Sequence, residues 1–426
     1  MDRQRLLQIL LDQRDELNSL VDDDFVERAE CARFEFNSKL AQVVIGVRRS
    51  GKSTLCHMAL RKNNVKYAYV NFDDDRLASL TVDDLNDILE VLYIIYGVDV
   101  RYLFFDEIQN VDGWHLFVNR LLRNGLHIFV TGSNAKLLSS ELATHLTGRY
   151  NEIRLYPFSF REFCLARHLN IDLPTTRNLA SQQTALYDYL LEGGFPELDG
   201  ISNRHAYVEG IINAIITKDI RKRFRLRNAD AIKLLANHLI NNVGQLININ
   251  AISEDLGIGT PKTVRKYIDY LSQAFLIIPL NKFSYKSRDR LRNEKLYLID
   301  TGVMTYRHNG LAPGNLGWRL ENVIMMELLR RTDPAYQDIY YYKPASSSRE
   351  VDFVVTEHSR VRELIQVSLD ISNPKTLKRE LTALVEASRK LHCDELTLIA
   401  MSQSRTEEME GKVIRIMSAH EWLLTK

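Results

Sequence analysis

The chain has 426 residues, of which 45% are hydrophobic and 26% are charged, and its formal net charge at pH 7 is +1. This length predicts two or three domains, and this composition excludes a largely disordered protein. A nearly neutral chain has no overall attraction to nucleic acid or to a membrane surface, so any basic site must be local.

The amino-terminal stretch and the cysteines indicate a cytoplasmic protein. Residues 1–38 are predicted to form a helical lead, because leucines recur there near helical spacing with charges between them. The first residues are charged and no apolar run reaches membrane-spanning length, so we expect no membrane contact. The cysteines are widely spaced, which fits a reducing compartment and argues against a disulfide framework or a zinc knuckle: Cys31, Cys56, Cys164 and Cys393.

A glycine-rich loop follows an apolar run at residues 41–45. Gly46 and Gly51 bracket four residues and precede Lys52 and Ser53, which is the spacing of a phosphate-binding P-loop. Glycines let backbone N–H groups curl around phosphates, and the next helix points its positive end at them. Lys52 is therefore predicted to bind the β- and γ-phosphates of ATP, and Ser53 to bind Mg²⁺. The predicted nucleotide-binding residues are Gly46, Val47, Arg48, Arg49, Ser50, Gly51, Lys52, Ser53 and Thr54.

Strands and helices alternate after the loop. Alternation of this kind predicts right-handed crossovers, a parallel sheet and a ligand site at the carboxyl ends of the strands. We therefore predict an α/β fold whose first part, residues 39–165, is a P-loop ATPase domain of the AAA or RecA-like kind. The expected strands are 67–72, 101–107 and 127–134, and the expected helices are 82–95 and 113–124.

Two acids end the third strand. Asp106 is predicted to hold the magnesium ion through water, and Glu107 to orient and deprotonate the attacking water. The alternative is an acidic pair that ends a strand at the surface without any catalytic role. The upstream P-loop favours the catalytic interpretation.

Three further polar residues lie near the end of the fourth strand. Thr131, Ser133 or Asn134 could sense the γ-phosphate, although Thr-Gly-Ser-Asn is also good turn chemistry. Arg149 precedes another strand and could supply positive charge to the transition state. It could equally be an ordinary surface arginine.

Residues 166–228 are predicted to form a helical lid or connector. Its end carries a basic cluster that either tracks phosphates or forms the solvated face of a helix, and the flanking acids Asp219 and Asp230 favour the second interpretation. The cluster comprises Lys218, Arg221, Lys222, Arg223, Arg225 and Arg227.

Residues 229–294 have the pattern of a winged helix. A short helix over 249–256 ends at Gly257, and Thr260 with Pro261 starts a second helix, which is helix-turn-helix spacing. Two strands joined by a basic loop would complete the wing. Such modules bind DNA or dock proteins, and the sequence leaves both open. The basic residues that could contact phosphates are Lys262, Arg265, Lys266, Lys286, Arg288, Arg290 and Arg292.

Residues 295–426 read as helix, antiparallel strands, crossover helix and strand, the order of a restriction-endonuclease-like core. Glu321 and Asp352 could be two metal-binding acids of such a core. The third acid and the lysine are replaced by Gln366 and Ser368. We therefore expect a degenerate fold without nuclease activity.

In this order, the motifs make the chain resemble the bacterial and archaeal AAA-type ATPases that carry a C-terminal DUF4143 region. The resemblance spans nearly everything after residue 39, and it implies ATP binding and hydrolysis with Mg²⁺, a winged-helix middle and a nuclease-like tail. It does not supply a substrate. The motifs that carry it are residues 46–54, 106–109, 131–134, 148–149, 193–197, 295–302 and 349–353.

We therefore predict a Mg²⁺-dependent ATPase that converts ATP to ADP and phosphate, with turnover moving the C-terminal modules. The rival prediction is a nucleic-acid-binding or nuclease-like effector, for example in host defence, in which ATP is only a switch. Glu107 favours turnover, since a switch that does not hydrolyse ATP could lose this base. The prediction includes an unidentified protein partner, leaves DNA open, and allows a homo-oligomer.

Overall fold

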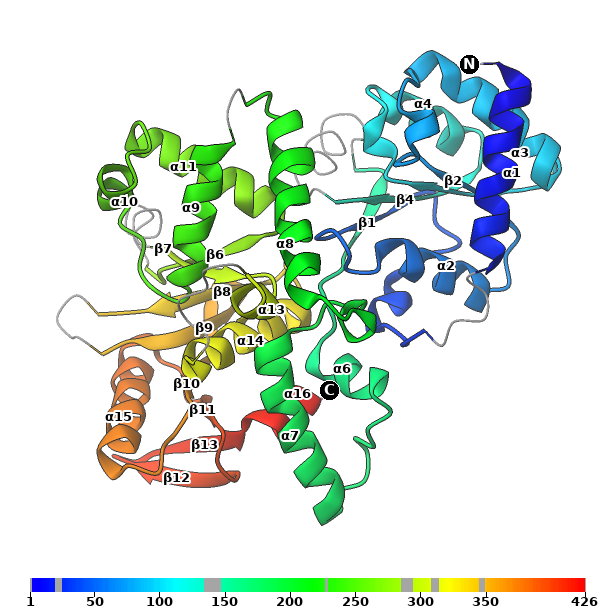
Figure 1. Cartoon of the computed structure of the whole chain (residues 1–426). Helices are drawn as coiled ribbons and strands as arrows, with labels where there is room; N and C mark the ends of the chain where they lie inside the picture. The colour runs from blue at the N-terminus through cyan, green and yellow to red at the C-terminus, as the bar shows by residue number, and fades with distance from the viewer. Residues whose placement is uncertain are drawn as a thin grey trace. The chain divides into compact units, whose positions relative to one another are not determined.

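The computed structural model describes residues 2–19, 25–133, 146, 148–226, 229–284, 294–307, 314–344 and 349–425. Contacts within the chain divide it into two compact units. Unit 1 is Met1–Tyr156 with Gln273–Phe275, and unit 2 is Pro157–Ser272 with Leu276–Lys426. Figure 1 shows the course of the chain through both.

Unit 1 is built on a five-stranded sheet in the order β2-β3-β4-β1-β5, and every pairing in it is parallel. The parallel sheet expected from the alternating pattern is thereby confirmed. In this order β1 lies beside β4, so the loop after β1 starts next to the carboxyl ends of β4 and β3. The strands are β1 Ala41–Ile45, β2 Tyr67–Asn71, β3 Tyr102–Asp106, β4 His127–Gly132 and β5 Tyr150–Arg154.

Helices cover both faces of this sheet (Figure 1). Adjacent residues of a strand point to opposite faces. Phe104 packs in a core with Leu55 of α2, whereas the ring of Phe105 lies 5.8 Å from that of Phe117 on α4. Burial on both faces explains why β3 is a continuous apolar run. The helices are α2 Lys52–Lys62, α3 Leu85–Tyr96 and α4 Trp114–Arg123, with 3₁₀ turns at Ala29–Arg33, Asp75–Leu77, Val82–Asp84 and Ile108–Asn110.

The amino-terminal helix α1, Arg3–Ser19, packs against α3 and β2. It buries Leu6, Leu10 and Leu17 at helical spacing. Gln13 pairs with the edge strand, since its amide group donates to the Asn71 carbonyl at 3.0 Å and accepts from the Asn71 N–H at 2.9 Å. The helix thus covers a sheet edge that would otherwise expose unpaired backbone groups.

The first part of unit 2 is helical and ends in a two-stranded antiparallel hairpin. The expected order of helices followed by a hairpin is present, while the winged-helix interpretation remains a prediction. In the basic cluster, Lys218, Arg221 and Lys222 are exposed and Asp219 is buried. The elements are α6 Phe160–Ala166, α7 Thr176–Glu192, α8 Arg204–Ala214, a π-helix Ile215–Lys222, α9 Asp230–Asn241, α10 Ile249–Asp255, α11 Pro261–Gln273, β6 Ile277–Asn281 and β7 Glu294–Leu298.

The second part of unit 2 holds a six-stranded sheet in the order β12-β13-β11-β10-β9-β8. Strands β8, β9 and β10 pair antiparallel, and α15 crosses to β11, which is parallel to β10. This is the order of elements that the sequence predicts, with β12 as an additional edge strand. The elements are α13 Gly302–Thr305, α14 Leu316–Arg331, β8 Gln337–Tyr342, β9 Val351–Glu357, β10 Arg360–Ser368, α15 Pro374–Leu391, β11 Leu396–Ala400, β12 Arg405–Met409, β13 Lys412–Ser418 and α16 Ala419–Leu424.

Two motifs that are about a hundred residues apart meet inside unit 2. Asp300 accepts hydrogen bonds from the Gly194 N–H at 2.6 Å and from the Gly302 N–H at 2.8 Å. A Cβ on Gly193 would lie 1.8 Å from a carboxylate oxygen of Asp300, so glycine is required there. Burial raises the pKa of Asp300 to about 6, although the two N–H donors oppose the shift.

This shift predicts a pH-dependent contribution to stability. The unfolded aspartate releases its proton near pH 4 and the folded one near pH 6, so raising the pH through this window disfavours folding by on the order of 3 kcal/mol. Asp300→Asn removes the carboxyl group that titrates in this window. Urea unfolding should therefore show a wild-type advantage over this variant that is larger at pH 4 than at pH 7.

The exposed Asp338→Asn is the matched control, and its unfolding profile should run parallel to that of the wild type at all pH values. Parallel profiles for Asp300→Asn and the wild type would contradict a raised pKa of Asp300 in the folded protein.

Candidate nucleotide site

The loop between β1 and α2 has the backbone that a phosphate cradle requires. A Cβ on Gly46 would lie 2.1 Å from the Leu155 carbonyl oxygen, which leaves room only for glycine. Gly51 has φ +88°, a conformation that other residues rarely adopt, and it is the N-cap of α2. The loop therefore ends at the amino terminus of an eleven-residue helix, where free N–H groups favour anions.

Lys52 is buried at the start of α2. Its Nζ donates to the Val47 carbonyl at 3.1 Å and lies 3.7 Å from Glu107 Oε1. The ammonium is therefore held inside the curve of the loop and next to the acid at the end of β3.

Asp106 is buried at the carboxyl end of β3. It accepts hydrogen bonds from the hydroxyls of Thr131 and Tyr69, the latter at 3.2 Å. Burial raises the pKa of Asp106, and the negative charge of Glu107 raises it further, whereas hydrogen bonds from Thr131 and Ser53 act in the opposite direction. Ser53 and Asp106 thus lie in contact.

Glu107 follows Asp106 in a left-handed backbone conformation, with φ 53°. Its side chain accepts from Gln109 and from the N–H and hydroxyl of Ser133, the last two at 3.3 Å. Burial alone would raise the pKa of Glu107, but the cations of Lys52 and Arg48 lower it below its ordinary value. Glu107 is therefore held in its ionised form, as a carboxylate.

These residues fit a magnesium–nucleotide complex. The Ser53 hydroxyl and the Asp106 carboxylate are hard oxygen donors that touch each other beside the loop, which is the ligand chemistry that Mg²⁺ prefers. No group of three or more acidic, histidine or cysteine side chains among the described residues is arranged to hold a metal. Mg²⁺ bound mainly by phosphates and water does not need one.

Comparisons with known proteins identify the family to which the chain belongs. A family model described as an AAA domain matches residues 38–164, and two models described as domains of unknown function match residues 183–312 (DUF8612) and 316–421 (DUF4143). An uncharacterized protein of Methanocaldococcus jannaschii, MJ1544, is 34% identical over 402 residues, which cover 90% of this chain and 88% of the relative. The chain belongs to the family of AAA-domain proteins with a C-terminal DUF4143 region.

The family has members in bacteria as well as archaea. An uncharacterized protein of Haemophilus influenzae is 31% identical over 406 residues, covering 90% of this chain and 94% of the relative. Among solved structures, the Walker-type ATPase PABY2304 of Pyrococcus abyssi matches 67% of this chain and 96% of its own, at 17% identity and a TM-score of 0.43. The Thermotoga maritima RuvB Holliday junction branch migration motor matches 62% of this chain and 87% of its own, at 15% identity and a TM-score of 0.28.

The remaining predicted residues of this AAA–DUF4143 protein are less closely tied to the loop. Thr131 and Ser133 contact the acids of β3, as described above. Arg149 is exposed just before β5, where its carbonyl accepts from the Ala41 N–H at the start of β1. That is the opposite end of β1 from the loop, about 13 Å away at the usual rise of a strand. Asn134 lies outside the described residues.

The sequence analysis missed three residues of the site. Tyr69 on β2 bonds Asp106, Gln109 bonds Glu107, and Arg28 bonds the Ser50 carbonyl at 3.3 Å. Gln109 could have been found from its place two residues after the acid pair. Tyr69 and Arg28 carry no such signal, because only the strand order and the path of the amino-terminal segment bring them to the loop.

The tail holds a second cluster of charged side chains. One of its members, Lys295, was not predicted from the sequence. Lys295 of β7 is buried, with its Nζ 3.3 Å from Glu321 Oε1 and in contact with Glu350. Burial opposes a charge there, but Glu321, Asp352 and Glu350 together raise the pKa of Lys295. Burial and the charge of Glu321 raise the pKa of Asp352 well above its ordinary value. Glu321 and Asp352 are thus brought together around an internal cation.

The residues expected in place of the third acid and the lysine lie on β10. Gln366 is buried and donates to Glu380 of α15 at 2.9 Å, and the Ser368 hydroxyl donates to the Asp370 carbonyl at 3.3 Å. Neither side chain adds a carboxylate or an ammonium group to the cluster. The only lysine that an ion pair places against Glu321 in the described part of the chain comes from β7.

Replacing Lys52 tests nucleotide binding. A ligand that binds only the native state stabilises it by about 2.7 kcal/mol at 100 times its dissociation constant. ATP with Mg²⁺ should therefore raise the melting temperature of the wild type and leave that of Lys52→Ala unchanged, as followed by differential scanning fluorimetry. Lys66→Ala, which loses only an exposed pair with Asp99, is the control and should respond like the wild type. Equal shifts in all three proteins would rule out this site.

Replacing Glu107 separates binding from chemistry. Glu107→Gln keeps the shape of the side chain but removes the base, so ATP binding should persist while phosphate release falls by about 10²- to 10⁴-fold. Glu90→Gln, on the exposed face of α3, should turn over at the wild-type rate. If Glu107→Gln also releases phosphate at the wild-type rate, the base is another residue.

Proposed function

We propose that this chain is a Mg²⁺-dependent ATPase that converts ATP to ADP and phosphate. The observation that carries the proposal is the arrangement of the buried Lys52 and Asp106 with the partly buried Glu107 at the carboxyl ends of β1 and β3. A cation within 3.7 Å of a carboxylate, beside a glycine loop, provides both a phosphate ligand and a base. The AAA family assignment supports the same activity.

The proposed chemistry assigns a role to each of these residues. The N–H groups of residues 46–53 bind the phosphates, and Lys52 leaves the Val47 carbonyl for the β- and γ-phosphates. Ser53 and Asp106 would hold Mg²⁺, which neutralises charge on the phosphates. Glu107 takes a proton from the attacking water. Ser133 and Gln109 orient Glu107, so any sensing of the γ-phosphate by Ser133 acts through this carboxylate.

Turnover is proposed to move the modules of unit 2, which we interpret as a winged helix followed by a degenerate endonuclease-like domain. The order α9, α10, α11, β6 and β7 supports the first interpretation, and the order from α14 to β11 supports the second. The alternative is a nucleic-acid-binding or nuclease-like effector switched by ATP. The presence of Glu107 supports turnover, since a pure switch does not need a base.

DNA binding by the winged helix rests on few described charges. Arg265 pairs with Glu294 at 2.8 Å and lies near Asp269, so it is committed within the module. Lys262 and Lys266 are exposed. The wing residues Lys286, Arg288, Arg290 and Arg292 lie outside the described residues. DNA binding and the docking of a protein partner, including a second copy of this chain, both remain proposals for this module.

A cytoplasmic location is proposed on the cysteines, all four of which are free thiols. Among the described residues, no helix is long and apolar enough to cross a membrane.

Assays of turnover and cleavage distinguish the two functions. If the chain is an ATPase as proposed, it should release phosphate from ATP without nucleic acid. It should not cleave DNA or RNA with Mg²⁺ or Mn²⁺. Lys262→Glu with Lys266→Glu should leave turnover unchanged. If these lysines touch DNA, a plot of the logarithm of the binding constant against the logarithm of the salt concentration should have a slope of about −0.9 per phosphate contact. The same pair of changes should then make that slope less negative.

Lys378→Glu on the exposed start of α15 is the control for these charge reversals. Metal-dependent cleavage that disappears in Asp352→Asn would favour the nuclease function and overturn the degenerate interpretation. Turnover that appears only with DNA or RNA would make nucleic acid the partner.

A further inference from the structure

Arg28 is a buried arginine in the segment that precedes the sheet of unit 1. Only 4% of the residue is exposed, and its Nε lies 3.8 Å from Glu30. The sequence analysis assigns residues 1–38 only a helical lead, with no role in the nucleotide site. A buried arginine in such a segment is costly unless its donors are used.

One end of the guanidinium group binds the nucleotide loop. Arg28 Nη1 donates to the Ser50 carbonyl at 3.3 Å and lies 4.0 Å from the place of a Cβ on Gly51. Ser50 is completely buried. A loop that turns its N–H groups toward phosphates must turn carbonyls away from them, and a buried carbonyl needs a donor. Arg28 supplies that donor for Ser50, two residues before the start of α2.

The other end binds the chain where unit 1 ends. Arg28 Nη2 donates to the Tyr156 carbonyl at 2.7 Å. The preceding residue, Leu155, donates to the Ile45 carbonyl at 2.8 Å and places its own carbonyl against Gly46. The stretch after β5 therefore passes directly beside the loop. A planar guanidinium with five fixed N–H donors can hold both carbonyls at once, which a lysine cannot do in the same geometry.

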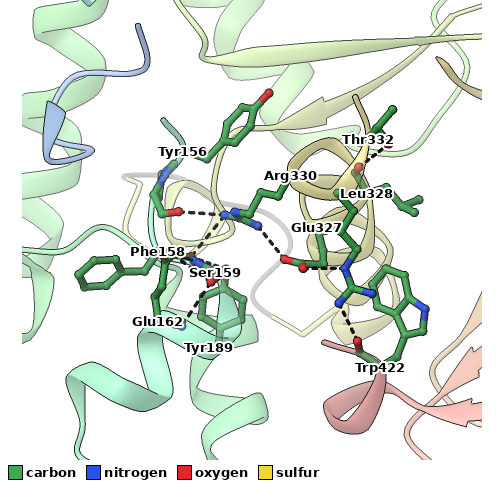
Figure 2. A network of polar contacts seen from close by, with 12 residues as sticks. Tyr156, Phe158, Ser159, Glu162, Tyr189, Glu327, Leu328, Arg330, Thr332 and Trp422 are labelled. Carbon is green, nitrogen blue, oxygen red and sulfur yellow. Dashed lines mark hydrogen bonds and ion pairs between the residues drawn. The ribbon is translucent and has the colours of Figure 1, made fainter. Parts of the chain in front are cut away.

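The next two carbonyls are held within unit 2, as Figure 2 shows. Arg330 of α14 donates to the Pro157 carbonyl at 2.9 Å and also contacts the Phe158 carbonyl. The Tyr189 hydroxyl donates to the Phe158 carbonyl at 2.6 Å, and the Phe158 N–H donates to the Gly194 carbonyl at 2.7 Å. Gly194 in turn is fixed by Asp300. Three consecutive carbonyls are thus held by two arginines, one from each unit.

We propose that Arg28 is a positioning residue of the nucleotide site that holds the Ser50 carbonyl and transmits the state of the loop to the backbone at Tyr156. A shift of the loop on nucleotide binding or phosphate loss moves the Ser50 carbonyl, and the shared guanidinium passes that shift to residues 156–158. The inference rests on the proposed ATPase function and adds its connection to unit 2.

The test compares Arg28→Lys with the wild type and with Arg123→Lys. Arg123 is the matched control, because it is an exposed arginine of unit 1, in the last turn of α4. Two readouts are used: steady-state hydrolysis of ATP with Mg²⁺, and hydrogen exchange at the amides of Phe158 and Gly194 with and without a saturating non-hydrolysable ATP analogue.

Arg28→Lys keeps the positive charge but loses the planar fork of N–H donors that holds both carbonyls. Its kcat/KM should therefore fall by about 10- to 100-fold, the scale expected for a misplaced catalytic loop. Nucleotide should change the exchange of Phe158 and Gly194 in the wild type and in Arg123→Lys, and should not change it in Arg28→Lys at saturation. If Arg28→Lys fails to fold, Arg28→Ala with added methylguanidinium is used, and turnover should recover with methylguanidinium but not with methylammonium.

Three outcomes overturn the inference. Arg28→Lys with wild-type kinetics shows that the fork does not position the loop. A nucleotide-dependent change in exchange that persists in Arg28→Lys shows that the signal takes another route, and equal recovery with methylammonium shows that only charge matters. Failure of the wild type to bind or hydrolyse ATP would instead refute the proposed function, so the two failures are distinguishable.

Discussion

The candidate nucleotide site depends on two adjacent carboxylates at the end of one strand, of which Asp106 is buried and Glu107 is partly buried. Asp106 and Glu107 repel each other, and burial penalises the charge of both. Lys52 and Arg48 compensate at Glu107, whereas Thr131, Tyr69 and Ser53 donate hydrogen bonds to Asp106. The parallel strand order places these partners on the two strands that flank β3, on the loop and on the first turn of α2. This strand order therefore holds together an arrangement of charges that a short peptide could not maintain.

Much of this site could be predicted from the sequence because its signals are local. The spacing from Gly46 to Ser53 and the apolar run before Asp106 each lie within a few residues, so strand, loop and helix follow from propensity and pattern. The parallel sheet follows from the alternation of strands and helices, and the structure confirms it. The roles of individual residues in catalysis stay predictions, since geometry alone does not show turnover.

Residues that act through long-range contacts could not be predicted. Arg28 lies 128 positions before its partner Tyr156, and Asp300 lies 106 positions after Gly194. Lys295 reaches Glu321 from a different strand than the one on which a lysine was expected. In each case a buried polar group needs a partner, and the folded path of the chain decides which residue supplies it. Composition and periodicity contain no such information.

The central claim is that residues 46–54 bind the phosphates of ATP and that Glu107 faces the attacking water. The most direct measurement is an experimental structure of the full chain with Mg²⁺, ADP and a γ-phosphate mimic. The account predicts Lys52 Nζ within hydrogen-bond distance of the mimic rather than of the Val47 carbonyl, Ser53 on the metal, and a water between Glu107 and the mimic. Phosphates bound away from this loop, or Glu107 still paired with Lys52, would contradict it.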